Sequence, residues 1–199
     1  MKRLATLLLL ALLPIVATGQ IRTGSDIESG NFAFGIDNYL LVSAASGGKA
    51  AFDFSTCGKA FKVIAEDGCV SVGETVLLEK YRPVLKVDKP LGIPAFAGKP
   101  DMVIGIHDFT SNRNPELVIA LRDPLAGGLV AYVYGYEKDC WKALGEIAAF
   151  GPEIYDCRIF RQAITVEDGE NLHTWTYRGG KFVFRSSNGS KDPSSLLSR

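Results

Sequence analysis

The sequence predicts an all-β protein made of antiparallel sheets joined by hairpins. Short runs rich in branched and aromatic residues recur along the chain, and turns containing glycine or proline separate them. Almost no stretch shows a convincing helical pattern. These observations leave the arrangement of the sheets open between a sandwich, a barrel and a few propeller-like blades.

The first half of the chain shows strand patterns up to residue 81. The expected strands are 51–54, 61–65, 69–72 and 75–81. Asp67 and Gly68 stand between the second and third of them and predict a hairpin, because glycine accepts the positive φ of a primed turn. The run 87–100 then carries three prolines, which cannot donate to a ladder, so we expect a long irregular connection there.

The second half shows stronger patterns. The expected strands are 102–106, 116–121, 129–136, 171–177 and 181–185, a strand begins in 155–166, and the run 140–150 fits either a strand or a short helix. Asp168-Gly169 predicts another hairpin, and Arg178-Gly179-Gly180 predicts the turn before the last strand.

The first residues have the features of a secretory signal peptide. Lys2 and Arg3 precede an apolar run over 4–16, and the small residues Ala17 and Gly19 precede a cut at Gln20. We therefore expect a signal peptide over 1–19, one β-rich domain over 20–185 and a polar, serine-rich, disordered tail over 186–199. The predicted location is secreted or periplasmic, with no membrane insertion after the signal is cleaved.

The charge balance argues against a nucleic-acid partner. The chain has 22 basic and 22 acidic residues, and loss of Lys2 and Arg3 with the leader leaves it slightly acidic. Nucleic-acid-binding domains carry a basic footprint instead.

Cysteines suggest crosslinks. Because an oxidising compartment favours disulfides, we expect two local ones, Cys57–Cys69 and Cys140–Cys157. In the chain-entropy model a loop of this length stabilises by about 3 kcal/mol.

One loop suggests a metal. In the run from Asp108 to Leu117, oxygen-bearing side chains fall on alternate positions between two hydrophobic strands. Over 102–121 the chain resembles a single degenerate repeat of the FG-GAP or VCBS type, found in integrin-α-like β-propellers, whose loop binds calcium. The resemblance implies ligand roles for the side chains of Asp108, Thr110, Asn112 and Glu116 and for the Asn114 carbonyl.

The loop departs from that pattern at several positions. Thr110 replaces an asparagine, Asn112 an aspartate and Arg113 a glycine, and the carboxylates are Asp108 and Glu116. Calcium affinity follows ligand charge and rigidity, so the expected cofactor is none or weakly bound calcium. In the alternative interpretation the loop is a turn held by hydrogen bonds from Asp108 and Asn112 to its own backbone.

Two aromatic stripes are candidate binding surfaces. Strand alternation places Tyr132, Tyr134 and Tyr136 on one face, which suits either a protein interface or a half-buried sheet. His173 shares a face with Trp175, and this pair suits either ligand stacking or packing inside the protein.

Catalytic motifs are missing from the sequence. It contains no G-x-S-x-G, no H-E-x-x-H and no glycine-rich loop between a strand and a helix. We therefore expect a secreted or periplasmic, non-enzymatic binding protein with an unidentified protein partner, such as an inhibitor or immunity-like protein. The alternatives are an enzyme acting on envelope or extracellular polymers and a weakly calcium-dependent carbohydrate or adhesion module.

Overall fold

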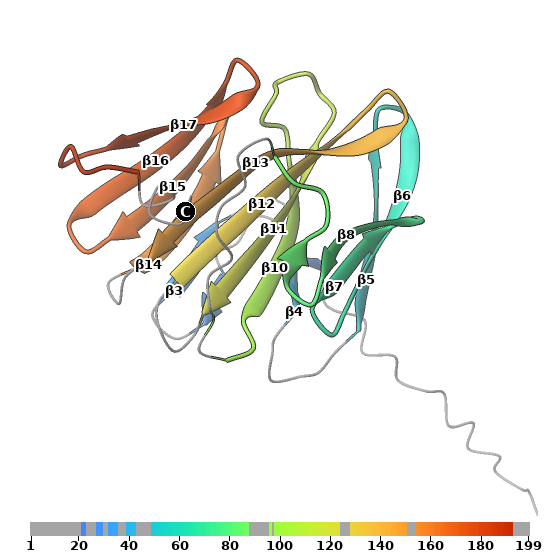
Figure 1. Ribbon diagram of the computed structural model, residues 1–199, viewed down its shortest axis with the longest axis horizontal. Helices are drawn as coiled ribbons and strands as arrows, with labels where there is room; N and C mark the ends of the chain where they lie inside the picture. Colours follow the sequence, from blue (N-terminus) through green and yellow to red (C-terminus); the bar gives the residue numbers. More distant parts are fainter. Residues whose placement is uncertain are drawn as a thin grey trace, which may run out of the picture.

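The computed structural model describes residues 21–22, 27–29, 32–35, 39–42, 49–87, 96, 98–123, 128–150 and 154–192. Side chains are described within 49–87, at 96, and within 98–123, 128–149 and 157–192. These parts of the chain form strands and turns and contain no helix (Figure 1). The expected signal peptide over 1–19 and the last residues of the expected tail, 193–199, lie outside the described residues.

The strands form three sheets, labelled A, B and C here. Sheet A runs β1 (Ile21–Arg22), β4 (Tyr39–Val42), β10 (Asp101–His107), β11 (Glu116–Asp123), β12 (Gly128–Glu137) and β13 (Cys140–Phe150). Sheet B runs β17 (Lys181–Ser186), β16 (Asn171–Arg178), β15 (Ala163–Asp168), β14 (Ile154–Phe160), β3 (Phe32–Gly35) and β2 (Ile27–Ser29). Sheet C runs β5 (Ala50–Thr56), β6 (Lys59–Glu66), β7 (Cys69–Val72), β8 (Thr75–Glu79) and β9 (Arg82–Pro83). Neighbouring strands are antiparallel except for the parallel pair β3 and β14.

Sheet A is the middle layer of the molecule (Figure 1). Strands β10 to β13 are apolar on both faces, because alternate residues enter two different cores. Met102 and Ile104 of β10 pack toward sheet C, whereas Val103 between them packs toward sheet B. Burying one such side chain contributes roughly 1.5–3 kcal/mol. The two cores therefore hold the sheets as a stack of layers.

One end of the stack gathers turns from every sheet. We call it the loop end and define it by the turns at 57–58, 108–115, 138–139, 161–162 and 179–180. Contacts between sheets confirm this grouping. The Lys59 ammonium lies 2.6 Å from the Asp139 carboxylate, and the His107 ring contacts the Arg161 carbonyl oxygen.

The predicted all-β fold with hairpin-linked antiparallel strands is confirmed, and the sheets form no closed barrel. The run 140–150 is strand β13. The strand expected to begin in 155–166 is two strands, β14 and β15, because Arg161 turns the chain with a positive φ of 55°. The start of the expected tail is ordered as well. Ser186 ends β17, and the backbone amide of Ser190 donates to the Asn188 side-chain oxygen.

The two expected disulfides are wrong, because no disulfide joins the four cysteines. Cys57 lies in the turn before β6 and Cys69 begins β7 after it, so the two lie at opposite ends of β6, which has eight residues and spans about 26 Å. Cys140 begins β13 in sheet A, whereas Cys157 is buried in sheet B. A disulfide needs Cα atoms within about 7 Å, so the strands keep each pair too far apart.

Candidate functional site

The turn between β10 and β11 is held by Glu116, the first residue of β11. Its carboxylate accepts the backbone amide of Phe109 at 2.7 Å and the Thr110 hydroxyl at 2.8 Å. Glu116 is only 4% exposed, and this burial raises the pKa of its carboxyl group. The Phe109 ring is fully buried and meets Phe182 of sheet B edge-on. Glu116 therefore fixes the start of the loop against the neighbouring sheet.

Asp108 holds the other half of the loop. Its two carboxylate oxygens accept the backbone amides of Asn112 at 3.1 Å and Arg113 at 2.9 Å. Ser111 and Arg113 have positive φ angles of 56° and 65°, which side chains rarely adopt without support. The Asp108 hydrogen bonds supply that support, so Arg113 can occupy a position that would suit glycine.

The side chains expected to bind calcium are thus engaged in the protein. The Asn112 side-chain oxygen accepts the backbone amide of Asn114, whose own side-chain oxygen accepts the amide of Cys57 in sheet C. No group of three or more His, Cys, Asp or Glu side chains that could hold a metal occurs within the described ranges. The loop therefore links sheets A and C through the hydrogen bond between Asn114 and Cys57. Weak calcium binding stays a prediction.

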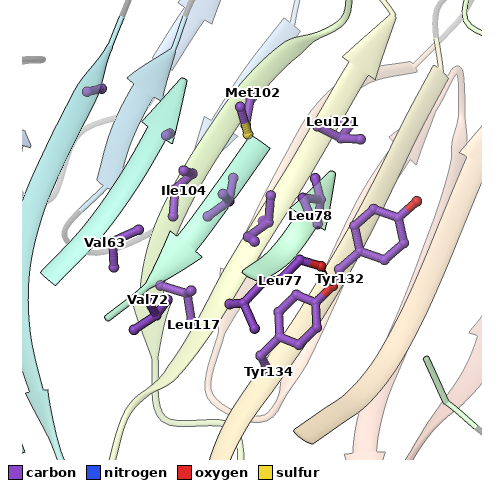
Figure 2. Close-up of a cluster of buried hydrophobic side chains, with 14 of the residues drawn as sticks. Val63, Val72, Leu77, Leu78, Met102, Ile104, Leu117, Leu121, Tyr132 and Tyr134 are labelled. Carbon is purple, nitrogen blue, oxygen red and sulfur yellow. Dashed lines mark hydrogen bonds between the residues drawn. The ribbon is translucent and has the colours of Figure 1, made fainter. Parts of the chain in front are cut away.

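The tyrosine stripe of β12 lies mostly inside the protein. Tyr132 is 3% exposed and Tyr134 is fully buried, and both pack against sheet C, as Figure 2 shows. The Tyr134 hydroxyl donates to the Leu77 carbonyl oxygen at 3.3 Å. Burial raises the pKa of both tyrosines far above its ordinary value. A partner could reach these rings only if sheet C separated from sheet A, so they belong to the core.

Tyr136 is the half-exposed member of the stripe. Its ring lies 4.7 Å from that of Phe61 and 5.3 Å from that of Trp141, measured between centroids. The Lys59 ammonium lies 3.2 Å from the Tyr136 hydroxyl and 2.6 Å from Asp139. This aromatic cluster joins the tips of two hairpins at the loop end. Tyr136 is therefore partly covered by side chains of both sheets.

His173 and Trp175 face sheet A and are 4% and 1% exposed. The His173 ring stacks on Phe184, and its Nε2 lies 3.4 Å from an Asp168 carboxylate oxygen. The Trp175 indole donates to Asp192 at 3.1 Å, which anchors the segment after β17. The structure therefore places both side chains in a packed interior. Neither presents a surface on which a ligand could stack.

The opposite face of sheet B is exposed, and it is not among the surfaces expected from the sequence. We call it the outer face and define it by two cross-strand rows. Strand register gives one row as Phe160, Ala163, Thr176 and Val183, and the next as Arg158, Thr165, Thr174 and Arg185. Strand alternation could have revealed it, because these residues occupy the positions between the buried ones.

Large apolar side chains stand open on this face. Phe160 is 69% exposed and Val183 39%, and Leu172, one row beyond Thr174 on β16, is 42% exposed. The hydroxyls of Thr165 and Thr174 lie 3.4 Å apart across β15 and β16. The Arg161 guanidinium lies over the Phe160 ring, 5.2 Å from its centroid. The face therefore combines an exposed aromatic ring, small β-branched residues and a cation.

Comparisons with protein-family models, with curated proteins and with solved structures find no match for this chain. Within the described residues, no helix is long and apolar enough to cross a membrane.

Proposed function

We propose that this chain is a secreted or periplasmic, non-enzymatic domain that binds a protein partner through the outer face of sheet B. The observation that carries the proposal is the exposure of Phe160, a large aromatic side chain that is 69% open to solvent. Single exposed apolar residues are common, but Phe160 shares a cross-strand row with Val183, itself 39% exposed.

The composition of the outer face supports a protein partner. Phenylalanine and arginine are enriched in protein interfaces relative to the rest of the surface, and aromatic residues carry much of the binding energy. Between Phe160 and Val183 this row carries Ala163 and Thr176, which both have short side chains. A partner can therefore contact Phe160 and Val183 together without displacing a long side chain between them.

Three of the polar side chains expected at candidate sites serve the fold. Asp108 and Glu116 hold backbone amides, and His173 lies inside the stack. The alternatives stay an enzyme acting on envelope or extracellular polymers and a weakly calcium-dependent carbohydrate or adhesion module. The oxygen-rich loop at Asp108 is the observation on which the calcium-dependent alternative depends.

A photo-crosslinking amino acid placed at position 160 tests the proposal in cells that secrete the chain. The matched control carries the same amino acid at Val76, which is 44% exposed on β8 of sheet C. We expect a discrete crosslinked product at position 160, containing a second protein identified by mass spectrometry, and none at position 76. Equal products at both positions, no product at position 160, or a product made only of this chain would contradict the proposal.

A further inference from the structure

Cations gather around the exposed apolar row of the outer face. Arg178 and Lys181 are an aligned cross-strand pair, and strand alternation puts them on this face. They lie one row nearer the loop end than Thr176 and Val183. Arg185 lies in the adjacent row, and Arg161 covers Phe160 from the turn at the loop end. Basic side chains therefore border the apolar row along β16 and β17 and at the tip of β14.

These four cations make no ion pair with another described residue. Arg158, opposite Thr165, interacts with another group of the chain and is therefore not counted among these four cations. Glu167 is the acidic residue among the described side chains of the outer face. It lies one row further from the loop end than Thr165. Asp156 aligns with Glu167, but its side chain lies outside the described residues.

The positive charge of the outer face is a local excess, because the whole chain has a formal net charge of zero. Sheet C provides the comparison. On its exposed side Lys49 pairs with Glu66 at 3.0 Å, and Lys62 lies in register with Asp53. Opposite charges therefore stand side by side on β5 and β6, whereas the described cations bordering Phe160 have no described acidic residue aligned with them.

We propose that the partner of this domain presents an acidic protein surface to the outer face of sheet B, an inference that depends on the proposed function. Complementary charge is the property that selects the partner. Arginine side chains pair with carboxylates through two parallel hydrogen bonds, and uncompensated cations accelerate encounter with an acidic surface. The exposed row of Phe160 and Val183 then supplies the apolar contact at the centre of the interface.

Fluorescence anisotropy with labelled poly-L-glutamate measures the acidic preference without knowledge of the partner. The test variant replaces Arg178, Lys181 and Arg185 by glutamine, and the matched control replaces Lys62, an exposed lysine of sheet C, by glutamine. We expect the triple variant to bind roughly tenfold or more weakly at low salt and the control to bind like the wild type. The difference should shrink as ionic strength rises, because salt screens exposed charges.

Two further probes define what would overturn the inference. Equal binding of poly-L-lysine, or binding of dextran sulfate without binding of poly-L-glutamate, would exclude an acidic protein as the preferred ligand. Unchanged melting temperatures confirm that the glutamine variants fold.

The crosslinker at position 160 separates this inference from the proposed function. Loss of the crosslinked product in the triple variant, with its retention in the Lys62→Gln background, supports both. A product that persists undiminished in the triple variant would leave the proposed function in place and overturn the acidic partner. Absence of a product in every background would overturn the proposed function itself.

Discussion

Replacement of Asp108 by alanine should destabilise the protein whether or not calcium is present. The carboxylate accepts the backbone amides of Asn112 and Arg113 at 3.1 and 2.9 Å, and alanine leaves both donors to solvent. Each such hydrogen bond contributes about 1 kcal/mol, so the free energy of unfolding should fall by about 2 kcal/mol. Ser111 and Arg113, with their positive φ angles, also lose the groups that hold them.

Thermal unfolding in millimolar calcium and in chelator measures the effect. For a domain of this size, 1 kcal/mol corresponds to about 2–4 °C, so the melting temperature should fall by about 4–8 °C in both buffers. Asp108→Asn keeps one acceptor oxygen and should lose roughly half as much. For the wild type, a calcium site with a dissociation constant of about 10⁻⁴ M would add at most about 1.4 kcal/mol at millimolar calcium.

The calcium dependence decides between the two interpretations of the loop. A wild-type shift with calcium that is larger than a few degrees and vanishes in Asp108→Ala would show that the loop is a metal site first. An unchanged melting temperature for Asp108→Ala in chelator would show that the two backbone hydrogen bonds contribute nothing. Either result would refute the interpretation that Asp108 holds the loop by accepting its backbone amides.

Three further measurements test the packing. Tyr134→Ala should cost about 3–5 kcal/mol by chemical unfolding, because it empties a core position; a loss below about 1 kcal/mol would place the ring outside the core. The wild type should lose stability relative to Glu116→Gln as pH rises from 4.5, the ordinary glutamate pKa, through the raised pKa of Glu116 in the folded state. In this range the unfolded chain releases the Glu116 proton while the folded protein still holds it, so rising pH favours unfolding. Parallel pH profiles for the two proteins would refute this. Iodoacetamide should modify Cys57 and Cys140 in the native state but Cys157 only after unfolding, and equal rates would contradict the burial of Cys157.

Strand existence was predictable from the sequence because it depends on local alternation and on glycine turns. Asp67-Gly68 and Asp168-Gly169 both mark hairpins as expected. The turn after Phe160 has no glycine or proline, and Arg161 adopts the positive φ itself. That is why 155–166 gave no signal of the break between β14 and β15.

The candidate site was less predictable, because it depends on how the sheets stack. Alternation correctly places Tyr132 and Tyr134 on one face, but it cannot say that sheet C covers that face. His173 and Trp175 turn toward sheet A for the same reason, which leaves their neighbours Thr174 and Thr176 outside. The cysteine pairing failed because short sequence spacing was taken as closeness, although β6 carries Cys57 and Cys69 to opposite ends.

The most direct test of the proposed function is the affinity for the protein captured at position 160. The measurement compares the wild type with Phe160→Ser combined with Val183→Ser, and with Val76→Ser, a change at an exposed apolar residue of sheet C, as the control. If the outer face of sheet B is the binding surface, the double variant should bind roughly 10–100-fold more weakly, with its melting temperature and the affinity of the control unchanged. Equal affinities for the wild type and the double variant would contradict the account.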